Sequence, residues 1–154
     1  MNHENQPSRI ASAQADNDNV SIAQVVIADD DPDALELLGE VLRPLAVQVH
    51  KASSGAELVV LLADHGPFDL IVTDIDMPWM EGLGVIRSAR AAEIETPVLF
   101  VSGIARPDLE TSIARLSNAR ILRKPVAIAD LRHAVRQMLV AWEARRPHRR
   151  HETA

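Results

Sequence analysis

Short apolar runs alternate along the chain with longer segments in which apolar residues recur at helical spacing. The short runs predict five strands at residues 25–28, 47–50, 70–74, 97–101 and 120–123. The longer segments predict five helices, with apolar stripes within residues 35–45, 58–62, 83–92, 109–116 and 131–142. Strands that alternate with helices in this way are typical of a parallel sheet with helices on both faces. Because crossovers between parallel strands are right-handed, we expect a doubly wound α/β sheet.

The third predicted strand carries the residue on which the functional interpretation depends. The run from Leu70 to Thr73 has no polar alternation and so predicts a strand buried on both faces. Asp74 follows, and Pro78 and Gly82 then interrupt the chain, which places Asp74 at the carboxyl end of a central strand. Ligands and chemistry are found at that edge of open parallel sheets. We therefore expect Asp74 to be a nucleophile that accepts a phosphoryl group.

Three other predicted strands also end in polar residues. Asp29 and Asp30 follow the first strand, Ser102 ends the fourth and Lys124 follows the fifth. Since the carboxyl ends of parallel strands share one edge, these groups can converge on Asp74. Clustered carboxylates repel one another, and a hard divalent cation such as Mg²⁺, which prefers oxygen ligands, would relieve that repulsion. The set suits phosphoryl transfer, which needs positioning and charge neutralisation.

Length and composition exclude several classes of protein. The chain has 154 residues, enough for one domain, and its 47% apolar and 25% charged residues are typical of ordinary soluble globular proteins. It has no cysteine, which excludes disulfides, thiolate metal sites and a cysteine nucleophile. The net charge of −6 argues against nucleic acid as the main partner. Neither a membrane span nor a signal peptide is recognisable, so we expect a cytoplasmic protein without membrane contact.

The polarity of the chain divides it into three parts. Residues 1–23 are small and polar without apolar periodicity, and we expect a disordered lead there. Residues 24–143 hold all the predicted strands and helices. Residues 144–154 are basic, and we expect a frayed tail.

Four motifs, in this order along the chain, resemble those of the receiver domain of bacterial response regulators in two-component systems. They lie at residues 25–32, 69–82, 97–103 and 122–125, and the resemblance extends over roughly residues 23–142. It implies a flavodoxin-like fold with strand order 2-1-3-4-5. It also implies a regulatory phospho-acceptor rather than an enzyme. The donor to Asp74 would be a phosphohistidine on a sensor histidine kinase or on a histidine phosphotransfer protein.

The resemblance implies a specific Mg²⁺ site around the nucleophile. Asp30 and Asp74 would bind the ion directly, and Asp29 would act through water. The backbone carbonyl of Asp76 would complete the ligands from the protein. The side chain of Asp76 occupies a position where asparagine is a common choice in the family.

The resemblance also assigns roles near the fifth strand. Ser102 and Lys124 would contact the phosphoryl oxygens, and the Lys124–Pro125 peptide bond is expected to be cis. Two positions depart from the family pattern, because Ile121 stands where an aromatic switch residue is usual and Val126 stands where a phenylalanine is usual. These departures leave the phosphorylation chemistry intact and put the transmission of the signal in question.

No output domain is recognisable after Trp142, so the resemblance implies a stand-alone receiver. Such a protein would act through protein contacts or as an intermediate in a phosphorelay, with a downstream partner that the sequence does not identify. A homodimer through the face formed by the fourth helix, the fifth strand and the fifth helix is one arrangement that the resemblance allows.

Two other functions remain open from the sequence. Asp74-Ile75-Asp76 resembles the start of haloacid dehalogenase-type phosphatases, but in those enzymes the nucleophile strand comes first, and no paired-acid motif follows Lys124 here. The second alternative is a receiver-like scaffold that binds partners without phosphorylation. The complete acidic set argues against a scaffold, and Ile121 and Val126 favour it.

Overall fold

The computed structural model describes residues 21–77, 82–103, 105 and 107–146. The strands are β1 (Gln24–Ala28), β2 (Gln48–Ala52), β3 (Leu70–Asp74), β4 (Val98–Ser102) and β5 (Ala119–Arg123). The helices are α1 (Pro32–Leu42), the short 3₁₀ helix η1 (Arg43–Leu45), α2 (Gly55–Asp64), α3 (Gly82–Ala91), α4 (Pro107–Ala114) and α5 (Ile128–Arg145). All strand pairs are parallel, in the order β2-β1-β3-β4-β5. The predicted fold class and strand order are therefore confirmed.

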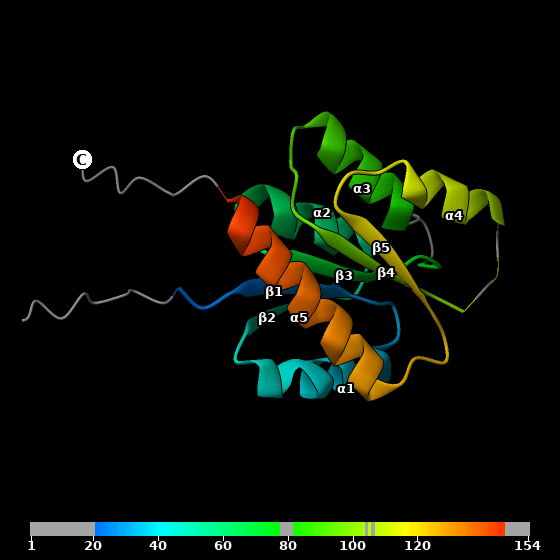
Figure 1. Ribbon diagram of the computed structural model, residues 1–154. Coiled ribbons are helices and arrows are strands. Elements are labelled where there is room, and N and C mark those ends of the chain that lie inside the picture. Colours follow the sequence, from blue (N-terminus) through cyan, green and yellow to red (C-terminus); the bar gives the residue numbers. More distant parts are fainter. Residues whose placement is uncertain (1–20, 78–81, 104, 106, 147–154) are drawn as a thin grey trace, which may run out of the picture.

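Helices cover both faces of the sheet (Figure 1). On one face, Val25 and Ile27 of β1 pack in a cluster with residues of α1 and α5, among them Leu42 and Val135. Val26, between them in the sequence, belongs to the opposite cluster, which includes residues of α2, α3 and α4. This division follows from the alternation of side chains along a strand. Leu70 to Thr73 of β3 are all buried, as the unbroken apolar run predicts.

Two helices begin at polar capping residues. Asp31 accepts a hydrogen bond from the backbone N–H of Asp33, and Pro32 occupies the first position of α1. Ser54 accepts one from the N–H of Glu57, at 3.1 Å, and caps α2. These contacts satisfy N–H groups that have no partner within the helix.

Helix α2 ends just before Gly66 and Pro67. The helix ends at Asp64, with His65 as its C-cap, and no glycine among the described residues has a positive φ. Gly66 is therefore not a left-handed cap of the usual kind. The Gly66–Pro67 peptide bond is cis, and the chain enters Phe68 and β3 from it.

The last helix continues further than the sequence indicates. Helix α5 extends to Arg145, and Arg146 forms an ion pair with the buried Asp69. The other carboxylate oxygen of Asp69 accepts a hydrogen bond of 2.7 Å from the N–H of Gln24. Residues 144–146, which the sequence analysis assigns to the tail, therefore contact the folded domain. The rest of that tail, residues 147–154, and residues 1–20 of the expected lead lie outside the described residues.

We expect the Arg146→Ala variant to be destabilised by about 1–2 kcal/mol, because it leaves the buried Asp69 carboxylate with the Gln24 N–H as its remaining partner. The matched control is Arg145→Ala. Arg145 is an exposed neighbour that hydrogen-bonds only to the Asn118 side chain among the described residues, and its loss should cost no more than about 0.5 kcal/mol. Urea denaturation measures both. Equal stabilities of the two variants would contradict a structural role for the Arg146–Asp69 pair.

Candidate functional site

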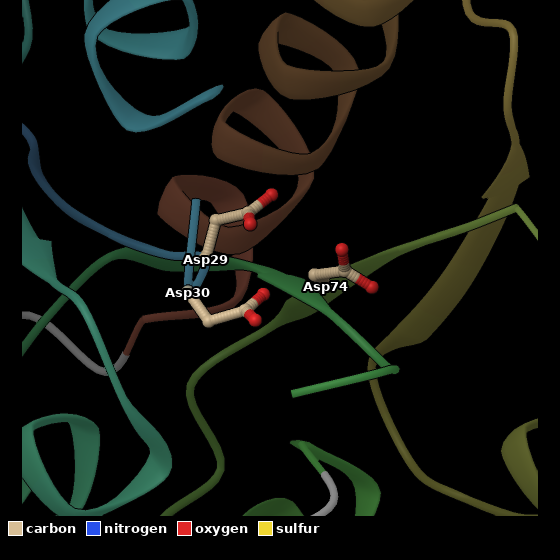
Figure 2. A group of neighbouring side chains, drawn as sticks. All are labelled: Asp29, Asp30 and Asp74. Atoms are coloured by element: carbon tan, nitrogen blue, oxygen red, sulfur yellow. The ribbon is translucent and has the colours of Figure 1, made fainter. Parts of the chain in front are cut away.

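Three carboxylates meet at the carboxyl edge of the sheet. Asp29 and Asp30 directly follow β1, Asp74 ends β3, and these two strands are neighbours. Figure 2 shows the three side chains, with the carboxylates of Asp29 and Asp30 turned toward Asp74. One oxygen from each residue can be chosen so that all three lie within 4.8 Å of one another. Asp29 is buried, Asp74 is partly buried and Asp30 is exposed, so solvent reaches one side of the group.

Backbone hydrogen bonds orient two of these carboxylates. Asp29 Oδ1 accepts from the N–H of Asp31, and Asp74 Oδ1 accepts from the N–H of Asp76, each at 2.9 Å. The second oxygen of each carboxylate lies near one ammonium group. Lys124 Nζ is 3.0 Å from Asp74 Oδ2 and 3.9 Å from Asp29 Oδ2. Lys124, which follows β5, therefore reaches the same point as the ends of β1 and β3.

The charges in this group perturb one another. Burial raises the pKa of Asp29, and the charge of Asp74 raises it further, although the hydrogen bond from Asp31 acts in the opposite direction. Burial by itself would lower the pKa of Lys124. The hydrogen bond to Asp74, with the charges of Asp74, Asp29 and Asp76, outweighs burial and raises that pKa above its ordinary value. Lys124 is therefore held protonated at neutral pH, while burial makes the ionised form of Asp29 less favourable.

These observations fit the predicted divalent cation. The side chains offer hard carboxylate oxygens within a span that one ion can bridge, which is the donor chemistry that Mg²⁺ prefers. Burial, and after it the charge of Asp74, keeps the pKa of Asp29 raised although Lys124 acts in the opposite direction. A bound cation would lower that pKa by favouring the ionised carboxylate. The side chain of Asp76 is exposed, and its backbone carbonyl remains the predicted further ligand.

Strand pairing brings the remaining predicted site residues to this edge. Ser102 ends β4 and is buried, and its backbone carbonyl accepts a 2.8 Å hydrogen bond from the N–H of Lys124. The Lys124–Pro125 peptide bond is cis. Ile121, at the expected switch position, lies on β5 and packs, partly buried, against the cluster that includes residues of α4. The structure thus brings together Asp29, Asp30, Asp74, Ser102 and Lys124, as the sequence predicts.

One contact that positions the nucleophile was not foreseen from the sequence. Gly82, the first residue of α3, lies so close to the end of β3 that a Cβ atom there would stand 2.6 Å from the carbonyl oxygen of Asp74. The same carbonyl accepts a 3.0 Å hydrogen bond from Thr73 Oγ1. A glycine a few residues after Pro78 is the only signal of this approach in the sequence, and it indicates a turn equally well.

An apolar pocket of about 190 Å³ adjoins the carboxylates between α1, α5 and the ends of the strands. Asp29, Asp74 and Lys124 contribute to its lining. Two apolar side chains in its wall are well exposed, Leu37 of α1 at 61% and Ile128 of α5 at 50%. Since large exposed apolar side chains grouped beside a polar site are typical of contact surfaces, this pocket is a candidate docking area.

No helix within the described residues combines the length and the apolar character that crossing a bilayer requires.

Comparison with known proteins identifies relatives over most of the chain. A family model described as the response regulator receiver domain matches residues 25–136. The response regulator receiver protein CpdR of Brucella abortus (strain 2308) is 30% identical over 118 residues, which are 77% of this chain and 98% of that protein. The transcriptional regulatory protein PrrA of Mycobacterium tuberculosis (strain ATCC 25618 / H37Rv) is 34% identical over 122 residues. The match covers 78% of this chain and only about half, 51%, of PrrA.

Solved structures share the fold. A CheY-like response regulator receiver domain from Methanospirillum hungatei JF-1 matches with a TM-score of 0.74 and 24% identity, over 80% of this chain and 98% of that one. The signal receiver domain of a putative Luxo repressor protein from Vibrio parahaemolyticus gives a TM-score of 0.75 at 18% identity, over 80% and 95% of the two chains. At these identities the structures support the fold alone.

Proposed function

The chain belongs to the response regulator receiver family, and from this premise we propose that it is a Mg²⁺-dependent phospho-acceptor with Asp74 as its nucleophile. The donor is a phosphohistidine of a sensor histidine kinase or of a histidine phosphotransfer protein. The observation that carries this proposal is the position of Lys124 Nζ, 3.0 Å from Asp74 Oδ2, beside the grouped carboxylates of Asp29 and Asp30.

The proposed step is an in-line displacement at phosphorus. A carboxylate oxygen of Asp74 forms the new O–P bond, the P–N bond to the donor histidine breaks, and its electron pair stays on the imidazole nitrogen. The product is an acyl phosphate on Asp74. The N–H of Asp76 holds Asp74 Oδ1 at 2.9 Å, so the carboxylate is oriented before the donor arrives.

The surrounding residues neutralise charge in this proposal. Asp30 and Asp74 would bind Mg²⁺ directly, Asp29 through water and Asp76 through its carbonyl, and the ion would offset the negative charge of the phosphoryl group. Lys124 pairs with Asp74 at rest and would turn to a phosphoryl oxygen afterwards. The buried Ser102 hydroxyl at the end of β4 would contact another phosphoryl oxygen.

The apolar pocket beside the carboxylates supports a protein donor. A phosphohistidine is presented on a protein surface, so its approach to Asp74 requires contacts around the site. Leu37 and Ile128 are exposed next to the pocket that Asp74 and Lys124 line, and they offer apolar area for that contact.

The output of the phosphorylated protein concerns how it passes the signal on. The match that covers 98% of the Brucella receiver protein supports a stand-alone receiver that acts in the cytoplasm through protein contacts or a phosphorelay. Ile121 supports the second candidate function, a scaffold that binds its partner without phosphorylation. An isoleucine on β5 provides no ring to move with Ser102 when the phosphoryl group arrives.

Labelling with a small-molecule donor tests the proposal. We expect the intact mass of the protein to rise by one phosphoryl group after incubation with acetyl phosphate and Mg²⁺. Because the carboxylates need the cation to offset their charge, a chelator should prevent the gain, and excess Mg²⁺ should restore it. Labelling that persists in the chelator would contradict the metal role. Turnover of a generic phosphomonoester without a stable labelled species would favour a phosphatase. If neither acetyl phosphate nor phosphohistidine donors label the protein, the result would favour the scaffold.

A further inference from the structure

A second pocket lies between the start of β5 and the last turns of α5, at the opposite end of the sheet from Asp74. Its volume is about 280 Å³. Figure 1 shows α5 crossing the sheet so that its end approaches the end at which β5 begins. Apolar residues form most of the lining, namely Pro97, Ala119, Met138, Ala141 and Trp142. The polar lining residues are Asn118, Arg120 and Arg145, and we call this site the β5–α5 pocket.

The two arginines of the β5–α5 pocket form hydrogen bonds with uncharged side chains. Arg120 donates a 3.0 Å hydrogen bond to the side-chain oxygen of Gln137, and Arg145 donates one of 2.7 Å to that of Asn118. Both acceptors are neutral amides, so they orient the guanidinium groups without offsetting their charge. Both arginines are exposed, and no carboxylate from the described part of the chain lines the pocket. The pocket therefore combines an apolar lining with two cations at its border.

Carboxylates on the adjoining segments have other partners. Glu95 accepts a 2.7 Å hydrogen bond from Ser117 Oγ, and Glu143 Oε2 lies 3.8 Å from Arg146 Nη1. Glu110 of α4 forms an ion pair with Arg123. These pairs leave Arg120 and Arg145 without an acidic partner in the described part of the chain.

The surrounding segment is basic although the protein is acidic. From Arg115 to Arg146 the sequence has eight lysines and arginines and two carboxylates, in a chain with a net charge of −6. Three of the eight, Arg123, Lys124 and Arg146, pair with carboxylates in the fold, so the excess positive charge rests on the other five. Opposite charges on two surfaces steer and orient association, so this segment favours an acidic partner. The apolar lining can accommodate an apolar side chain of such a partner. Nucleic acid binds mainly through its phosphates and would contact that lining less.

We propose that the β5–α5 pocket binds an acidic segment of a partner protein, with an apolar side chain in the pocket and carboxylates on Arg120 and Arg145. The proposal goes beyond phosphoryl transfer and does not depend on Asp74. A second copy of this chain fits the pocket poorly in a symmetric dimer. In an isologous dimer whose two-fold axis passes through the pocket, Arg120 and Arg145 would lie close to the same residues of the other copy, and like charges repel.

A labelled peptide tests the proposal on the full chain. The probe is a short fluorescein-labelled peptide in which Glu alternates with Leu and Phe, and its anisotropy reports binding. The emission of Trp142, isolated in a Trp79→Phe background, reports contact with the pocket itself. We expect saturable binding with a change in Trp142 emission. The Arg120→Gln/Arg145→Gln double variant should bind the peptide roughly tenfold more weakly, since two exposed charge pairs are lost.

Matched controls separate the pocket from general charge attraction. Arg115→Gln/Arg136→Gln removes the same charge from exposed positions outside the pocket lining, and should weaken binding by less than about twofold. Circular dichroism establishes that both double variants are folded. A peptide with Gln in place of Glu should lose most of its affinity.

Five outcomes would overturn the proposal. Three concern the peptide: no saturable binding up to its solubility limit, equal binding of the Gln peptide, and an equal loss of affinity in both double variants. The fourth is an oligonucleotide of matched charge that binds more tightly than the peptide through Arg120 and Arg145. The fifth is self-association that the Arg120→Gln and Arg145→Gln substitutions abolish. The last two would assign the surface to nucleic acid or to a second copy of the chain. Loss of labelling at Asp74 bears on none of them, so the two proposals fail separately.

Discussion

Asp74→Asn is expected to abolish phosphoryl incorporation from acetyl phosphate in the presence of Mg²⁺. Asparagine keeps the size of the side chain, and its one carbonyl oxygen can still accept the hydrogen bond from the Asp76 N–H, while its amide nitrogen cannot accept the one from Lys124. It lacks the anionic oxygen that must form the bond to phosphorus. Because the geometry is largely kept, loss of labelling would report loss of the nucleophile. Intact-mass analysis of the variant beside the wild type measures it.

The matched control for this substitution is Asp64→Asn, which makes the same chemical change at the exposed end of α2. We expect this control to gain one phosphoryl group like the wild type. The outcome that would count against Asp74 is a labelled Asp74→Asn protein. Borohydride reduction and peptide mapping would then identify the acceptor, and Asp30 or Asp29, within the same group of carboxylates, would be the first residues to examine.

Gly82→Ala should both destabilise the protein and slow its phosphorylation. The new Cβ would stand 2.6 Å from the Asp74 carbonyl oxygen and 3.1 Å from Thr73 Oγ1. The first contact is with backbone at the end of β3, so either α3 or the strand that carries Asp74 has to shift. Overpacking of this kind costs about 1–3 kcal/mol. Urea denaturation measures the loss of stability, and the rate of labelling by acetyl phosphate reports the displacement of Asp74.

Gly84→Ala provides the control within the same helix. Gly84 is exposed, and a Cβ built on it meets nothing within 4 Å. Alanine is favoured over glycine inside a helix, so this variant should be more stable than the wild type by up to about 1 kcal/mol. The free energies of unfolding of the two alanine variants are therefore expected to differ by about 1–4 kcal/mol, in opposite directions from the wild type. A Gly82→Ala protein as stable as Gly84→Ala would contradict the close approach of α3 to Asp74.

The sequence by itself determined the elements and the edge at which the chemistry lies. Apolar periodicity is a local property, so the run at Leu70 to Thr73 identifies a buried strand wherever that strand lies in the sheet. The placement of Asp29, Asp74 and Ser102 at strand ends follows from the same pattern. The four motifs then identified the family, whose known strand order the structure confirms.

The tertiary structure decided which groups meet and how their charges balance. The 3.0 Å contact of Lys124 with Asp74, the Arg146–Asp69 ion pair and the approach of Gly82 to Asp74 each join residues from different elements. Periodicity assigns a residue to a face or to the end of an element, but it leaves open how closely two elements pack.

The balance of charge at the β5–α5 pocket is also a tertiary property. In the sequence, Arg120 and Arg145 are two basic residues among many, and a basic segment is usually only solvated. Their distinctive feature is that Gln137 and Asn118 hold them beside an apolar pocket. No carboxylate of the described residues lines that pocket. Partners of this kind are fixed by the packing of α5 along β5, because contacts between distant segments arise only when the helix docks on the sheet.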